Sequence, residues 1–146
     1  MQLIGTEIYT ELNNLFTLID DLDGLEKLRL FNKKIVHVSA KYPEFQQVVV
    51  QEVFSETSRS EWLIEKLLKP IFGIMEGVIK EEKAKGRIKD IPQANLSSFI
   101  IGSITTLFSR SFQMKKMYGI DPRDKEQVDL HVTIINDLIF NGLRKQ

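Results

Sequence analysis

The chain has 146 residues, enough for one folded domain, and its 20 basic and 20 acidic side chains give a formal net charge of zero. Hydrophobic residues make up 42% of the chain and charged residues 27%, which is a globular composition and excludes wholesale disorder. The balanced charge excludes a whole-chain attraction to nucleic acid, and the absence of cysteine excludes disulfides, thiolate catalysis and cysteine-ligated zinc, so a cytoplasmic location is expected.

Apolar residues at helical spacing predict an all-α fold that begins with a helix over residues 2–20. A second helix is predicted to open at Asp23, because Glu26 follows three residues later in a capping pattern. This helix is expected to end at Tyr42, since the residue before Pro43 avoids the α conformation.

A third helix is predicted over residues 43–56 and a fourth from Ser58 to about Lys85. Ser58 and Glu61 form a capping-box pattern at the start of the fourth helix. Pro70 lies inside this helix and is expected to kink it, because proline cannot donate a hydrogen bond to the preceding turn. The residues of the third helix expected to face inward are Phe45, Val49 and Val53.

A fifth helix is predicted from Pro92 to Tyr118, and a sixth, capped by Asp124, to Leu143. Residues 91–109 contain no charged side chain, and this stretch has the length of a membrane span. Its glutamine, asparagine, serine and threonine side chains need hydrogen-bonding partners that lipid does not supply. We therefore expect no membrane span and no membrane partner.

The fifth helix has an apolar arc and, on the opposite side, a face of small side chains made by Ser98, Gly102, Thr105 and Ser109. Because no charged face lies between the two, the helix is expected to be buried on both sides. Leu130 and Ile134 add apolar surface outside the inner stripe of the sixth helix. These features predict a homodimer in which the last two helices of each subunit meet as a four-helix bundle.

Short connections join these six helices into a single domain over residues 1–146, an antiparallel bundle. Two stretches are distinctive: KYPEFQQVVVQE over residues 41–52 and EKLLKPIFGIMEGVIKEEKAKGRIK over residues 65–89. Together with the following proline-started helix and the final amphipathic helix, they resemble the C-terminal effector-binding and dimerisation domain of TetR/AcrR-family transcriptional regulators. The resemblance covers nearly the whole chain, and it implies a ligand-binding domain that senses a small hydrophobic effector.

Members of that family begin with a DNA-binding head that contains a helix-turn-helix, and nothing before Met1 supplies such a head. We expect a fragment cut just after the head, and a headless relative is the alternative. The resemblance implies that the first helix is the connector to the head, so that an effector moves the two heads of a dimer and releases the full-length protein from DNA. A stand-alone helical small-molecule-binding or adaptor protein is the alternative function.

An apolar cavity is expected between the second, fourth and fifth helices, lined by Phe31, Ile35, Phe72, Met75, Phe99 and Phe108. Aromatic and methionine residues at this spacing more often belong to the core, so about half of this set is expected to touch a ligand. Ser103 is a candidate polar anchor. Glu52, on the inward side of the third helix, is expected to meet either a cationic effector or an internal arginine.

Catalytic and metal-binding patterns are weak. His37 and His131 lie on different predicted helices, at no metal-ligand spacing. His37 is expected to face solvent, and His131 is expected to make a structural hydrogen bond. A carboxylate-bridged metal enzyme would need a Glu-x-x-His pair on an inward face, and the sequence lacks one. We therefore expect a protein that is not an enzyme and that needs no cofactor or metal.

Overall fold

The computed structural model describes residues 2–18 and 22–145. Within them the regular secondary structure is helical, apart from an antiparallel bridge between Ile88 and Arg144, which confirms the predicted all-α class. No helix in these ranges is long and apolar enough to cross a membrane. The elements are α1 (Gln2–Leu18), α2 (Gly24–Lys41), α3 (Pro43–Phe54), α4 (Ser58–Leu63), the π-helical turn η1 (Ile64–Leu68), α5 (Lys69–Ala84), α6 (Gln93–Ser109), α7 (Ser111–Tyr118) and α8 (Lys125–Leu143).

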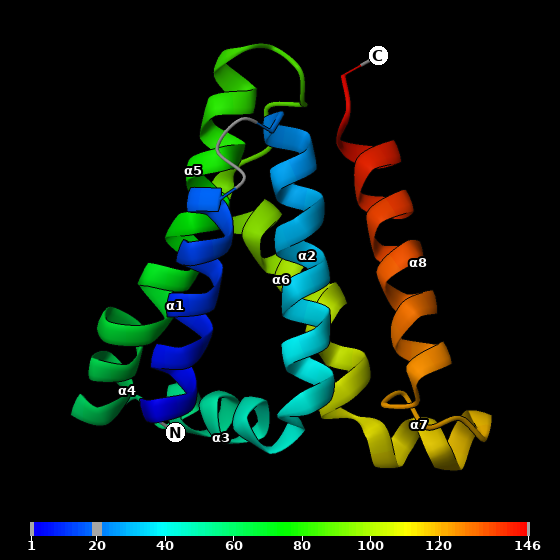
Figure 1. Ribbon diagram of the computed structural model, residues 1–146. Helices are drawn as coiled ribbons and strands as arrows, with labels where there is room; N and C mark the ends of the chain where they lie inside the picture. The colour runs from blue at the N-terminus through cyan, green and yellow to red at the C-terminus, as the bar shows by residue number, and fades with distance from the viewer. Residues whose placement is uncertain (1, 19–21, 146) are drawn as a thin grey trace.

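Helix α2 lies at the centre of the bundle and packs against α5, α6 and α8, while α1 packs against α5 (Figure 1). Helices α3 and α7 lie across one end of the bundle, and the last residue of α8 is near the other end (Figure 1). The core fills the space around α2 with side chains spaced three or four residues apart on the long helices, and α7 contributes none. Its most deeply buried members include Leu28, Phe31, Met75, Ile79, Ile100, Ile104, Phe108 and Phe140.

The predicted start of α2 is confirmed, because a carboxylate oxygen of Asp23 accepts a hydrogen bond from the Leu25 backbone N–H at 3.3 Å. The predicted cap of the fourth helix is wrong by one residue, since the N-cap of α4 is Thr57. The Thr57 hydroxyl accepts from the backbone N–H of Ser60, and the Ser60 hydroxyl oxygen accepts from the Thr57 N–H at 3.0 Å. Ser60 is fixed there because its hydroxyl also donates to the carbonyl of Glu52 in α3.

The interruption predicted at Pro70 takes the form of the π-helical turn η1, which directly precedes it. The Lys69 N–H donates to the carbonyl of Ile64, five residues back, so the backbone is wider here than in an α-helix. Pro70 is the second residue of α5, and because the helical backbone continues into it from η1, its missing N–H removes one bond to the preceding turn.

One continuous helix from Pro92 to Tyr118 was the prediction, and it is wrong. Helix α6 ends at Ser109, Arg110 leaves the α conformation with φ −112° and ψ 32°, and α7 then runs to Tyr118. Serine hydroxyls on both sides of the break donate to backbone carbonyls three residues earlier, from Ser109 to Thr106 and from Ser111 to Phe108. Bonds of this kind also occur inside α2 and α6, so they accompany the break and do not by themselves explain it.

The remaining boundaries agree with the periodicity to within a few residues. Helix α8 follows Asp124 and ends at Leu143, as predicted, although the Asp124 side chain makes no capping bond. Helix α1 is described to Leu18, and residues 19 and 20 of the predicted span lie outside the described residues.

The carboxylate of Glu82, near the end of α5, is buried against the start of α2 and is only 1% exposed. It lies 3.5 Å from an Nη of Arg87 and 3.6 Å from the Nζ of Lys85. The same Arg87 nitrogen is 2.7 Å from the Asp23 carboxylate. A Cβ placed on Gly24 would lie 2.3 Å from Glu82 Oε1, so the backbone approaches the carboxylate at a distance that only glycine allows.

Candidate ligand-binding groove

A groove of about 300 Å³ opens between α2, α3, the η1–α5 segment and α6. Helix α3 supplies the largest share of its lining, and α2 and α6 form the inner side. The groove lies at the end of the bundle that α3 covers (Figure 1). Its lining residues are Ile35, Val38, Phe45, Gln46, Val49, Val50, Val53, Phe54, Leu67, Leu68, Ile71, Phe72, Ile101 and Thr105.

The groove exists because α3 covers the core without closing onto it. Phe45, Val49 and Val53 repeat at intervals of four residues and are only partly buried against the core. Next to them, Val50 is 48% exposed and Phe54 is 81% exposed. A helix that keeps this much apolar surface in contact with solvent leaves room for an apolar molecule to complete the packing.

The lining contains two polar side chains, Gln46 and Thr105, and no charged one. The Gln46 Nε2 donates to the hydroxyl oxygen of Ser39 at 2.5 Å, and that hydroxyl in turn donates to the carbonyl of Ile35 at 2.7 Å. The amide nitrogen of Gln46 is therefore held by the protein. A ligand in this groove would lose water mainly from apolar surface, so the chemistry favours a neutral hydrophobic molecule.

Two of the residues predicted to bind the ligand, Ile35 and Phe72, line the groove. Three others belong to the closed core, because Phe31, Met75 and Phe108 are all 0% exposed. The predicted cavity lay between the second, fourth and fifth helices. The observed groove is displaced from there towards α3, which supplies the largest share of its lining.

The last three predicted ligand-binding residues lie outside the groove. Phe99 is 59% exposed on the outer side of α6. The Ser103 hydroxyl donates to the carbonyl of Ile100 at 2.9 Å. One carboxylate oxygen of Glu52 is 3.6 Å from the Nε of Arg59, so this side chain already has a cationic partner within the chain.

The sequence placed Phe45, Val49 and Val53 inward but did not assign them to the site, and it did not single out Phe54. The signal that could have found them is the run VVVQEVF on a short helix, which is too apolar for a helix with one inward face. Residues of such a helix that cannot all reach the core are candidates for a binding surface.

Most of the predicted interface residues lie on the surface of the single chain. Ser98 is exposed, and a Cβ on Gly102 would meet nothing within 4 Å. Ser109 is partly exposed and Thr105 lines the groove. On α8, the exposed fractions of three apolar side chains at four-residue intervals are 51% for Leu130, 42% for Ile134 and 65% for Leu138.

The two histidines of the chain, His37 and His131, have different surroundings. His37 is exposed, as predicted. His131 is partly buried, with Nε2 3.1 Å from the carbonyl oxygen of Ile104 and its ring edge-on to Phe108 at 5.5 Å. Because a carbonyl only accepts, Nε2 carries the proton. Burial lowers the pKa of His131, since it disfavours the charged imidazolium, and hydrogen bonds to backbone carbonyls oppose this shift.

The described residues include no group of three or more histidine, aspartate or glutamate side chains that could hold a metal ion. No protein-family model matches the chain, and no curated protein matches it.

Proposed function

We propose that the chain is the effector-binding and dimerisation domain of a TetR-type transcriptional regulator of the cytoplasm, and that it binds a small hydrophobic molecule in the groove. The groove carries this proposal, because twelve of its fourteen lining residues are apolar and none is charged. Its volume of about 300 Å³ is at the lower end of the range for small-molecule sites. An apolar molecule with fused or linked rings suits this lining better than a sugar or a nucleotide, because their hydroxyl and phosphate groups would lose water and find few polar partners.

A homodimer through α6 and α8 is part of the proposal. The His131 ring of α8 contacts the carbonyl of Ile104, which shows which side of α8 faces α6. Leu130, Ile134 and Leu138 lie on the part of α8 adjacent to that side, as the helical repeat of 3.6 residues requires. With Phe99 and Gly102 of α6 they form an apolar surface that suits a two-fold four-helix interface.

The groove also has a physical connection to α1, the helix that the resemblance implies is the connector to a DNA-binding head. Leu67 of η1 lines the groove, and η1 contacts α1. A ligand that displaces Leu67 shifts the packing of α1, and in a dimer this changes the separation of the two heads. The full-length protein would then leave DNA, which is bound only through the N-terminal head.

The ligand part of the proposal is tested with the neutral fluorescent probe N-phenyl-1-naphthylamine. We expect saturable binding with one probe per chain. Val49→Trp fills the groove and should abolish binding, whereas Val48→Trp, on the neighbouring exposed residue of the same helix, should leave it unchanged. No binding by the wild type, or equal binding by the two variants, would show that the groove is not the site.

The regulator part is tested in the coding sequence that precedes Met1. An in-frame segment that encodes a helix-turn-helix supports a TetR-type regulator. An in-frame stop codon directly upstream would contradict it and would favour the stand-alone binding protein.

A further inference from the structure

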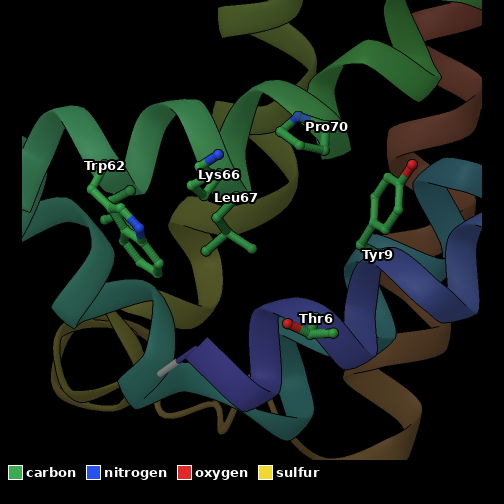
Figure 2. A pocket seen from close by; sticks show the side chains of 7 residues that line it. Thr6, Tyr9, Trp62, Lys66, Leu67 and Pro70 are labelled. Carbon is green, nitrogen blue, oxygen red and sulfur yellow. The ribbon is translucent and has the colours of Figure 1, made fainter.

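A second cavity, of about 260 Å³, lies on the other side of η1 from the groove. It lies between α1 and the continuous segment formed by α4, η1 and the start of α5, beside the contacts that join them. Leu67 contributes to both the cavity and the groove, and the remaining lining residues differ. Figure 2 shows the principal lining residues, which are Thr6 and Tyr9 on α1, and Trp62, Lys66, Leu67 and Pro70 opposite them.

Two aromatic side chains bound this cavity from different helices. Tyr9 on α1 is 38% exposed and Trp62 on α4 is 41% exposed, so each side chain keeps surface that a ligand could cover. Leu67 is almost fully buried and points into the space between α1 and η1 (Figure 2). Open aromatic faces beside a buried aliphatic side chain form a surface on which a planar ring packs well.

A single cationic side chain completes the lining. Lys66 is exposed, and within residues 2–18 and 22–145 it has no hydrogen-bond or ion-pair partner. Its acidic neighbour Glu65 is already engaged with Lys69 at 2.6 Å. Among the described residues that line the cavity, none is an aspartate or a glutamate. An ammonium group at an aromatic cavity without a competing carboxylate complements an anionic ligand.

The geometry points to a second ligand site that takes a small aromatic carboxylate. Its ring packs against Trp62, Tyr9 and Leu67, and its carboxylate accepts a charge-assisted hydrogen bond from Lys66 Nζ. The volume suits one ring with a short acidic chain. The proposal of this site does not rest on the proposed function. The groove takes a neutral ligand, and neither Tyr9 nor Trp62 lines it.

Trp62 is the only tryptophan of the chain, so tryptophan fluorescence reports directly on the cavity. Titration with 3-phenylpropanoate should give a saturable change in this signal. The neutral 3-phenylpropanamide has nearly the same shape and lacks the charge. Its carbonyl can still accept a hydrogen bond from Lys66, so only the attraction between opposite charges is lost. Because Lys66 is exposed, the amide should bind about two- to fivefold more weakly.

Lys66→Met should remove the preference for the acid over the amide, and Lys66→Arg should keep it. Lys80→Met is the matched control, because it removes an exposed positive charge that lines neither the cavity nor the groove. Equal binding of acid and amide by the wild type, no saturable signal, or an unchanged preference in Lys66→Met would each overturn the assignment. Since Lys66 lies outside the groove, failure here would leave the test of the groove unaffected.

Discussion

At the scale of single residues, the most unusual feature of the fold is the buried carboxylate of Glu82. Glu82 lies at the start of α2, where the helix dipole and the cations of Arg87 and Lys85 offset the cost of burying its carboxylate. Gly24 supplies the necessary space. Sequence reasoning did not anticipate this arrangement, because nothing in the local pattern shows that α5 ends against α2.

Gly24→Ala should therefore destabilise the protein. The added methyl group would lie 2.3 Å from Glu82 Oε1, and overpacking of this kind costs about 1–3 kcal/mol in the free energy of unfolding. Gly77→Ala in α5 is the matched control. It has nothing within 4 Å of the new methyl group and should gain about 0.5–1 kcal/mol, because alanine favours the helix. Urea denaturation measures both, and a neutral Gly24→Ala would contradict the overpacking and show that the Glu82 side chain can move aside.

His131 should make the stability depend on pH. Burial lowers its pKa in the folded protein below the ordinary value of 6.5, so the unfolded chain binds the proton more readily. The stability that His131 contributes is complete above pH 6.5 and is lost as the pH falls towards the folded pKa. Urea denaturation over about pH 5–8 should show a smaller loss for His131→Gln than for the wild type. If His37→Gln shows the smaller loss and His131→Gln does not, the assignment fails.

At the scale of single elements, the sequence predicted helix existence well and helix ends less well. Apolar periodicity located each helical region, because one side of every helix must reach the core. The break between α6 and α7 could not be seen in that pattern, since it is a change in the backbone of the single residue Arg110. The cap of α4 was misplaced because Thr57, Ser58 and Ser60 are all capable of capping.

The cap of α4 gives a direct test at this scale. Thr57→Ala should lower the free energy of unfolding by about 1 kcal/mol, because it removes the acceptor for the Ser60 N–H. Ser58→Ala is the matched control, and it should change the stability by less than about 0.5 kcal/mol since Ser58 is exposed. Equal losses in the two variants, measured by urea denaturation, would contradict the observed capping box.

Only part of the candidate site was predictable, because the periodicity of a helix does not show how that helix packs against the others. Ile35 and Phe72 point towards the core side of long helices, and the periodicity found both. The contribution of α3 depends on how that short helix crosses the end of the bundle, which is a tertiary property that no local pattern encodes. The full burial of Phe31, Met75 and Phe108 likewise follows from how closely α2, α5 and α6 pack.

At the scale of the whole molecule, the exposed apolar face of α6 and α8 should hold two chains together. Leu130→Glu combined with Ile134→Glu places two charges in the proposed interface, and this should convert the dimer to a monomer. Val48→Glu, at an exposed position on α3, is the control and should remain dimeric. Light scattering coupled to size-exclusion chromatography measures the mass. A dimeric double variant would place the interface elsewhere.

The proposal of a ligand groove in a dimeric domain is tested most directly by sedimentation equilibrium with N-phenyl-1-naphthylamine, recorded in the absorption bands of both protein and probe. The wild type should sediment with twice the chain mass of 16.9 kDa and carry one probe per chain. Val49→Trp should keep the dimeric mass and carry none. A wild-type protein that sediments as a monomer, or that carries no probe, would contradict the proposal.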